Sequence, residues 1–292
     1  MTLEQLRIFI AVAEKQHVTQ AASELNLTQS ATSAAIAALE ARYGIKLFDR
    51  VGRGIVLTQT GRDFLHEARG VVARANAAAQ VLNDLAGLKR GSLTLAASQT
   101  VANYWLPRRI QTFRKAYPDI KLHVTIANTE QVAQAVHQGS ADLGFVEGEI
   151  DDPFLSVRKI DGDSLIVVVG KNHPWARQSR ITPKNLSTTD WVLREKGSGT
   201  RSMFETALRK FGIKLSDLRI ALELPSNEAV RAAVESSDCA TAISDLVVER
   251  SIATGILHRV KIEMPRRSFF VLRHKERYVS QTEKALLASF QL

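Results

Sequence analysis

The chain has 292 residues, of which 45% are hydrophobic and 24% charged, an ordinary globular composition long enough for two or three domains; we expect neither a membrane span nor a signal peptide. The net charge of +9 suggests a polyanionic partner, but residues 1–88 hold nine Lys or Arg and eight Asp or Glu, so charge alone does not locate a DNA site. The single cysteine, Cys239, excludes an internal disulfide and a multi-cysteine metal cluster, and we expect a cytoplasmic protein without a cofactor or a membrane partner.

The first 45 residues predict three helices. Apolar residues at helical spacing from Leu3 indicate a first helix that ends near residues 15–17. Thr19 is expected to cap a second, short helix, and Thr28 a third that stops at Gly44. Two short helices joined by a brief turn form a helix-turn-helix.

The third helix is expected to have a buried face and a DNA-facing one. Ile36, Leu39 and Tyr43 mark the buried face, whereas Gln29 and Glu40 lie on the other. The N-terminal turn of such a helix can enter the major groove, where a glutamine reads adenine and hydroxyls contact bases or phosphates. The candidate DNA-binding residues of this helix are Thr28, Gln29, Ser30, Thr32 and Ser33.

Residues 46–50 and 55–58 predict two short strands joined by a turn rich in glycine and arginine. This hairpin would be the wing of a winged helix-turn-helix. Arg50 and Arg53 lie at its tip, where guanidinium groups suit phosphates or a narrow minor groove. A three-helix bundle with a solvated polar face explains the helical spacing about as well.

From Gly61 onward, apolar residues recur at alternating steps of three and four. This seam is typical of a long helix that packs against a partner helix, and a homodimer would match an operator with dyad symmetry. The alternative is a helix that packs on its own domain. The seam comprises Leu65, Ala68, Val72, Ala75, Ala79, Leu82 and Ala86.

Strand-like and helix-like segments alternate from Gly91 onward, which predicts an α/β sheet with ligands at the carboxyl ends of its strands. The loop at residues 197–200 adds two glycines before a helix, and its backbone amides can face an anion. Loops and helix caps also need polar residues, so a structural role stays open for each of them. The candidate effector-binding residues are Ser98, Thr100, Asn128, Glu147, Ser198, Thr200 and Asn227.

We find no catalytic or metal-binding motif: GxSxG, HExxH, Rossmann glycines and paired Cys/His ligands are all absent from the sequence. We therefore predict no catalytic residue and no metal ligand. The main rival to a DNA-binding protein is a cytoplasmic solute-binding protein whose N-terminal bundle only dimerises.

Residues 3–61 resemble the DNA-binding domain of LysR-type transcriptional regulators. The match includes an Ala-Ala pair, LxxTQSxxS, LE, LFDR and LTxxG, although Ala34 and Ala35 replace the long polar side chains of many members. The segments SLTLAASQTVANYWLP, ADLGFVEG, WVLREKGSGTR and ELPSNEAVRAAV are similar to the effector domain of the same family. The resemblance thus extends over nearly the whole chain.

This resemblance implies an all-α winged helix-turn-helix with a long linker helix, followed by an α/β effector domain similar to type 2 periplasmic binding proteins. It implies a homo-oligomer, dimer or tetramer, that binds a double-stranded DNA operator and can contact RNA polymerase. The implied domains are the DNA-binding domain (1–59), the linker helix (60–89) and the effector domain (90–292). Within the effector domain, subdomain I would comprise about 90–162 and 267–292, and subdomain II about 163–266. The two strands that cross between the subdomains would do so near 161–164 and 264–268.

Within the family, ANYWLP, GFVEG and REKGSGTR look most like regulators of sulfur assimilation, sulfite response and carbon fixation. The implied effector is a small oxyanion such as sulfite or sulfate, with a small carboxylate second. Glu147 would disfavour an anion unless a cation or a proton offsets it, and Arg194, Lys196 and Arg201 are the cations available in the sequence. Ser237 and Cys239 stand where relatives usually have Gly-x-Gly, and we expect Cys239 to be buried rather than reactive.

Overall fold

The computed structural model describes residues 1–52, 54–85, 91–148, 150–178 and 180–290. The chain divides into two compact units, the first formed by Met1–Leu88 and Gln138–Ser140 and the second by Lys89–His137 and Ala141–Leu292. None of the helices described is long and apolar enough to cross a membrane.

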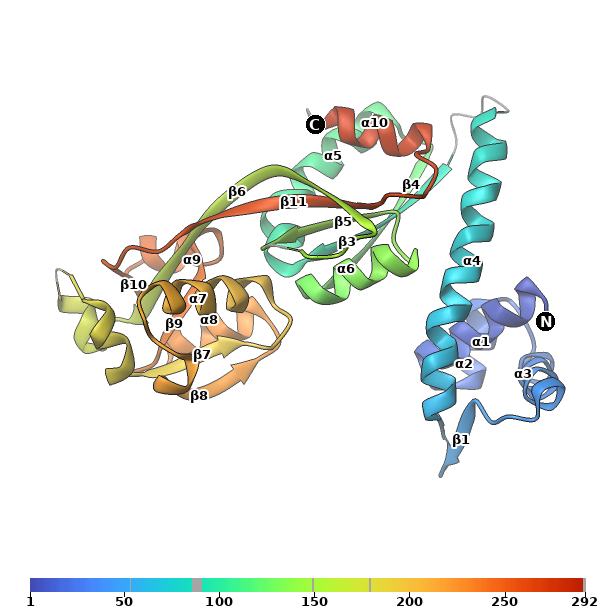
Figure 1. Cartoon of the computed structure of the whole chain (residues 1–292), viewed down its shortest axis with the longest axis horizontal. Helices are drawn as coiled ribbons and strands as arrows, with labels where there is room; N and C mark the ends of the chain where they lie inside the picture. Colours follow the sequence, from blue (N-terminus) through green and yellow to red (C-terminus); the bar gives the residue numbers. More distant parts are fainter. Residues whose placement is uncertain (53, 86–90, 149, 179, 291–292) are drawn as a thin grey trace. The chain divides into compact units, whose positions relative to one another are not determined.

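The first unit contains a helix-turn-helix, a two-stranded wing and a long helix (Figure 1). Antiparallel pairing of the two strands forms the wing. The elements are α1 (Leu3–Lys15), α2 (Val18–Glu24), α3 (Gln29–Tyr43), β1 (Phe48–Val51), β2 (Gly54–Leu57) and α4 (Gln59–Leu85).

Local capping explains where the first three helices begin and end. The N-cap of α2 is His17, whose ring nitrogen accepts from the backbone N–H of Gln20, so our prediction that Thr19 is the cap was wrong. Asn26 adopts a left-handed conformation with φ of 55° in the turn between α2 and α3, which asparagine tolerates better than most residues. The predicted caps of α3 are confirmed, with Thr28 at its start and Gly44 at its end.

The exposed and buried faces of α3 differ in part from the prediction. Tyr43 is 52% exposed, whereas Glu40 is buried. The Glu40 carboxylate accepts from the backbone N–H of Leu47 at 2.8 Å and pairs with Lys46 at 2.9 Å. Burial by itself would raise the pKa of Glu40, but these bonds and one from Phe48 hold it below its usual value. Glu40 thus fastens α3 to the start of the wing and does not face outward.

The first half of α4 belongs to the core of its own unit. Ala68 is buried together with Leu6, Phe9, Leu39 and Leu47, and Phe64, Leu65 and Val72 pack against that cluster. Further along the predicted seam, Ala79 and Leu82 are exposed. The helix therefore uses one part of its apolar stripe within the unit and leaves the other part at the surface.

The second unit is an α/β structure whose elements alternate along the chain (Figure 1). The helical segment that follows the first strand of this unit begins as a π-helical turn. The elements are β3 (Gly91–Ser98), the π turn η1 (Val101–Trp105), α5 (Leu106–Ala116), β4 (Ile120–Ala127), α6 (Thr129–Gln138), β5 (Leu143–Glu147), β6 (Leu155–Gly170), the 3₁₀ turns η2 (Pro174–Arg177) and η3 (Pro183–Thr188), β7 (Asp190–Arg194), α7 (Gly199–Lys210), the 3₁₀ turn η4 (Leu215–Asp217), β8 (Arg219–Leu224), α8 (Asn227–Glu235), β9 (Ala240–Ser244), α9 (Asp245–Ala253), β10 (Leu257–Val260), β11 (Arg266–His274) and α10 (Gln281–Ser289).

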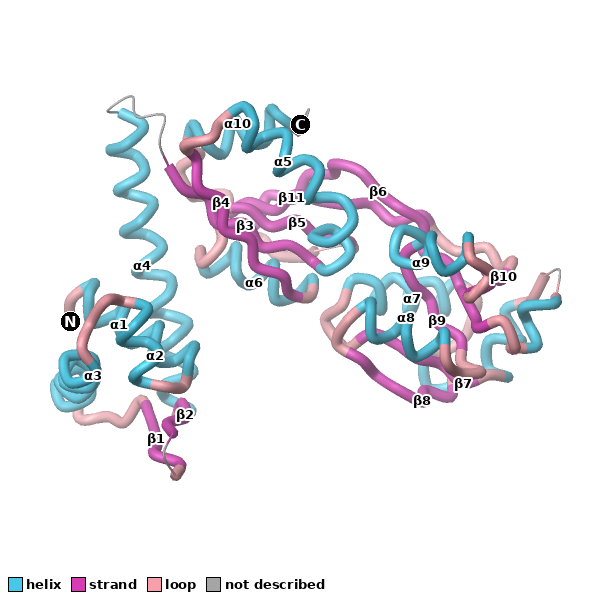
Figure 2. The backbone as a smooth tube through the Cα atoms, turned by 180° about the vertical axis from the view of Figure 1, so that it is seen from behind, coloured by secondary structure: helices cyan, strands magenta, loops and turns pink. Residues whose placement is uncertain are grey.

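Two long strands join the two subdomains of this unit. Among the described residues the strand order is β4-β3-β5-β11-β6-β9-β7-β8, and β10 also pairs with β6. In Figure 2, β6 and β11 run side by side from one subdomain into the other. Their antiparallel register pairs Arg267 with Asp163 and Ser268 with Gly162. The two predicted crossings therefore lie opposite each other on neighbouring strands.

Each subdomain is a sheet with helices on both faces. In subdomain I, apolar residues of η1, α5 and α10 pack around Phe145 and Phe269 on one face, and Val132 and Val136 of α6 cover the other. In subdomain II, α7 packs with Trp191 on one face while α8 and α9 cover the opposite one. Cys239 is half-buried at the edge of the last cluster.

Candidate functional site

The first candidate site is the N-terminal turn of α3. Gln29, Ser30 and Ser33 are exposed there. Thr28 is the cap of the helix, since its hydroxyl oxygen accepts from the backbone N–H of Ala31 at 3.2 Å. Its oxygen also lies 3.1 Å from the Ser30 hydroxyl. This turn offers amide and hydroxyl groups to a ligand without rearrangement of the fold.

Thr32 does not belong to that surface. Its side chain is fully buried, and its hydroxyl donates to the backbone oxygen of Thr28 at 3.1 Å. The structure therefore corrects our expectation that Thr32 contacts DNA, because its only polar group already has a partner inside the unit. Arg50 is exposed on β1 opposite Ile55, whereas Arg53 lies outside the described residues.

The second candidate site is a buried polar cluster centred on the carboxylate of Glu147. Ser98 donates to Oε2 of Glu147, and the hydroxyls of Thr100 and Thr200 each lie 3.4 Å from Oε1. Asn227 joins through its side-chain N–H, which donates to Thr100 Oγ1 at 3.1 Å. The structure thus brings together five of the seven residues predicted to bind an effector.

These five side chains come from both subdomains. Ser98 ends β3 and Glu147 ends β5 in subdomain I, and Thr100 immediately precedes η1. Thr200 is in the first turn of α7, and Asn227 begins α8, both in subdomain II. The cluster therefore forms only where strand ends of one subdomain meet helix N-termini of the other, as expected for an open α/β sheet.

Arg267 is the counter-charge of the cluster, and sequence reasoning missed it. Its side chain is 0% exposed and donates to Thr200 Oγ1 at 2.8 Å. It also lies 3.7 Å from Glu147 and makes a bidentate pair with Asp163. Although burial would lower the pKa of the Arg267 guanidinium, its hydrogen bond to Asp163 and the nearby carboxylates hold it above its usual value.

The cations that the sequence suggested have internal partners instead. Arg194 is buried, donates to Asn227 Oδ1 at 2.6 Å and pairs with Glu195 at 2.9 Å. Arg201 is buried and pairs with Glu205 and Glu223. Lys196 is exposed. Of these three, only Arg194 touches the cluster, and it does so through Asn227.

The two remaining predicted residues have different surroundings. Asn128 caps α6 by accepting from the backbone N–H of Gln131 at 2.9 Å, and the neighbouring Thr129 makes the link to the cluster. The Thr129 hydroxyl donates to the backbone oxygen of Glu147 and accepts from the N–H of Gly199, both at 3.1 Å. Ser198 is buried at the start of α7, and its hydroxyl has no hydrogen-bond partner among the described residues.

Gly199 is needed for this close approach. A Cβ atom at Gly199 would lie 2.2 Å from the backbone oxygen of Glu147 and 2.6 Å from the hydroxyl of Thr129. No other residue can therefore place the first turn of α7 against the end of β5 without a shift of the backbone. Gly199 therefore holds the first turn of α7 against the end of β5.

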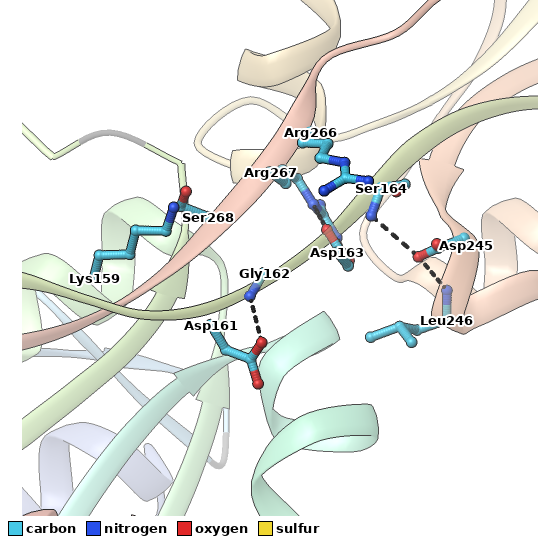
Figure 3. A pocket seen from close by; sticks show the side chains of 10 residues that line it. All are labelled: Lys159, Asp161, Gly162, Asp163, Ser164, Asp245, Leu246, Arg266, Arg267 and Ser268. Atoms are coloured by element: carbon cyan, nitrogen blue, oxygen red, sulfur yellow. Dashed lines mark hydrogen bonds and ion pairs between the residues drawn. The ribbon is translucent and has the colours of Figure 1, made fainter. Parts of the chain in front are cut away.

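A cavity of about 550 Å³ lies at the crossing strands (Figure 3). Figure 3 shows Lys159 and Ser268 near each other on one side and Asp245 on the other. Arg267 and Asp163 line the cavity and also connect to the polar cluster, but none of the seven predicted effector residues lines it. Across the described ranges, no group of three or more His, Cys, Asp or Glu side chains is placed to hold a metal ion.

Comparison with known proteins agrees with this architecture. The chain is 32% identical over 295 residues to the HTH-type transcriptional regulator YeiE of Escherichia coli K12, with 98% of this chain and 96% of the relative covered. Full-length CbnR in complex with its target DNA has a similar fold, with a TM-score of 0.68, 20% identity, and coverage of 100% of this chain and 99% of that one. The regulatory domain of CcmR from Synechocystis PCC6803, in complex with 2-PG, matches 69% of this chain and 96% of its own length, with a TM-score of 0.63 and 26% identity.

Two family profiles account for most of the sequence. The bacterial regulatory helix-turn-helix protein profile of the lysR family matches residues 3–62, and the LysR substrate binding domain profile matches residues 86–291. The chain therefore belongs to the LysR family of DNA-binding transcription regulators, in which an effector-binding domain follows the helix-turn-helix.

Proposed function

We propose that this regulator binds its operator through the first turn of α3 and the wing, and that a small anion bound at the Glu147 cluster controls it. In this proposal, residues 1–59 bind DNA, residues 60–89 form the dimer contact and residues 90–292 bind the effector. One observation carries the effector assignment: polar side chains of both subdomains meet at the start of α7, where the buried Ser198 hydroxyl lacks a partner among the described residues.

For DNA binding, we assign base contacts to Gln29 and Ser33 and phosphate contacts to Thr28, Ser30, Arg50 and Arg53. The exposure of Gln29 and Ser33 on one turn of α3 supports base readout. Such contacts require a protein that reaches operator DNA, so we also place it in the cytoplasm. The exposed Ala79 and Leu82 of α4 support a homodimer, which can pair further into a tetramer.

Selection from a random duplex DNA library tests the DNA assignment. Gln29→Ala is expected to lose sequence preference at one or two positions, by about 1–3 kcal/mol each. Arg50→Ala is expected to weaken binding to all sequences and to lower the salt slope of log K by about one per protomer. Arg158→Ala, which removes an exposed cation from β6, is the matched control. An unchanged sequence preference in Gln29→Ala, together with an unchanged affinity and salt slope in Arg50→Ala, would contradict the assignment.

For the effector, we propose a small oxyanion, such as a sulfur oxyanion, or a small carboxylate. The Ser198 hydroxyl, which has no partner among the described residues, and the first-turn amides of α7 supply hydrogen-bond donors, and the helix dipole favours negative charge. The regulatory domain of CcmR, which is 26% identical to this chain, is in complex with 2-PG, and this supports a small-molecule effector for the second unit. We propose binding without catalysis, because the polar groups of the cluster hold one another and the matched family consists of transcription regulators.

A thermal-shift screen of the full chain tests the effector assignment, since a ligand bound only by the native state raises the melting temperature. The probes are sulfite, sulfate, thiosulfate, phosphate and small carboxylates. Thr200→Val is expected to lower the affinity for the best-binding probe about 10- to 100-fold, which is the usual effect of losing a hydrogen bond to a charged group. Thr206→Val on the same helix removes a hydroxyl that donates only to Ser202 and is the control. If the best probe raises the melting temperature of Thr200→Val as much as that of the wild type, the Glu147 cluster is not the effector site.

A further inference from the structure

The hydroxyl protons of the Glu147 cluster are already committed. A hydroxyl has one proton to donate. Thr100 Oγ1 accepts from Asn227, and Thr200 Oγ1 accepts from Arg267, so their own protons are directed to Oε1 of Glu147. Ser98 donates its proton to Oε2. Three of the hydroxyls that a bound anion would need therefore serve a single carboxylate of the protein.

A fully ionised ligand would compete with Glu147 for these protons. Such a ligand has acceptors only, and it would lie beside a second negative charge in a site where Glu147 is 1% exposed. Arg267 is the only cation in direct contact with Glu147 among the described residues, and Asp163 shares it. Arg194 reaches the cluster through Asn227 and is balanced by Glu195. Burial of like charges or unpaired acceptors in such a place is costly.

A ligand that carries its own proton avoids this conflict. Its O–H or N–H can donate to Glu147, which releases one hydroxyl of the cluster toward the ligand. Its negative oxygen can then accept from Ser198, the one buried hydroxyl of the site without a partner among the described residues, and from the first-turn amides of α7. Every acceptor and donor of the site would then be paired.

We infer that Glu147 is the specificity-determining residue of the proposed effector site, and that the effector is an anion with its own hydrogen-bond donor. The class includes singly protonated oxyanions and small hydroxy acids, and it excludes ions such as sulfate that hold no proton at neutral pH. This inference rests on the proposed location of the effector. Sites that hydrogen-bond a ligand group discriminate strongly against analogues that lack it, because a buried partner is left unpaired.

Two pairs of probes test the inference by titration calorimetry on the full chain at pH 6.5. Phosphate and sulfate share a tetrahedral shape, but only phosphate carries a proton at this pH. Glycolate and acetate share a carboxylate, but only glycolate has a hydroxyl. The wild-type protein is expected to bind the donor-bearing member of at least one pair 100-fold or more tightly than its partner. Glu147→Gln, which replaces one acceptor oxygen by an N–H donor, is expected to reduce this preference below tenfold.

The possible failures are distinguishable. Equal binding of both members of each pair by the wild-type protein would overturn the inference and leave the anion site in place. Retention of the preference by Glu147→Gln, with an unchanged melting curve, would overturn the role of Glu147. Binding of no probe by either protein would remove the proposed anion effector, and the inference with it. The wild-type comparison stands even if Glu147→Gln does not fold.

Discussion

Replacing Arg267 with Met is expected to lower the free energy of unfolding of the second unit by roughly 3–5 kcal/mol, which is the usual result of breaking a buried ion pair on one side. Met fills much of the space of the guanidinium stem but carries no charge. Asp163 and Glu147, whose side chains are 1% and 2% exposed, would then remain buried without their common cation. Thr200 would also lose a hydrogen-bond donor.

Urea denaturation followed by tryptophan fluorescence measures this change. Trp105, Trp175 and Trp191 are the three tryptophans of the chain, and all lie in the second unit, so their signal reports on that unit. Arg158→Met, an exposed substitution on β6, is the control and should stay within about 0.5 kcal/mol. Adding Asp163→Asn to Arg267→Met should restore part of the loss. A loss below 1 kcal/mol would mean that the cluster is not held by this cation.

The stability of the second unit is expected to fall between pH 5 and pH 8 by about 2–3 kcal/mol because of one carboxyl group, Glu283. Burial raises the pKa of Glu283 to about 7, Arg273 at 3.7 Å opposes the shift, and Asp142 adds to it. The group is 4% exposed, and its Oε1 has no hydrogen-bond partner among the described residues. The folded state therefore holds a proton that the unfolded chain releases near pH 4.5.

The sign follows from this difference in proton binding. A carboxyl with a raised pKa stabilises the folded state fully when the pH is below its pKa in the unfolded chain, 4.5. This stabilisation is lost as the pH rises through its pKa in the folded state, about 7. Glu283→Gln should remove this part of the pH dependence, because the amide does not titrate. Urea titrations at pH 5 and pH 8 measure how steeply the free energy of unfolding falls with pH in the wild type and in Glu283→Gln. The exposed Glu276→Gln is the control. Equal slopes in the wild type and Glu283→Gln would show that Glu283 does not titrate in this range.

Sequence patterns predicted the elements of this fold well where a local signal sets them. Thr28 and Gly44 have the side chain and the backbone freedom that begin and end α3. The same patterns failed for the faces of α3. The helix is rich in alanine, so its buried and exposed faces differ little in hydrophobicity. The burial of Glu40 depends on the backbone N–H groups of Leu47 and Phe48, whose positions no local pattern gives.

The centre of the effector site could be predicted only in part. Ser98, Thr100, Glu147 and Thr200 follow strands or begin a helix, and general topology places such positions at one edge of a sheet. Arg267 gave no such signal, because a charged residue on a strand is ordinarily exposed. Its reason for burial lies in Asp163, which is 104 residues earlier in the chain. Contacts over such separations depend on strand register, which no local pattern specifies.

The position of β11 in the sheet bears on the order in which the protein can fold during synthesis. β11 lies between β5 and β6, and α10 packs on the same face of subdomain I as α5. Subdomain I therefore lacks a central strand until residues 266–274 have left the ribosome, whereas the helix-turn-helix unit and much of subdomain II precede them. A nascent chain would complete its DNA-reading unit well before its sensor. Chains that stop short of β11 should thus carry an intact helix-turn-helix unit without a complete second unit.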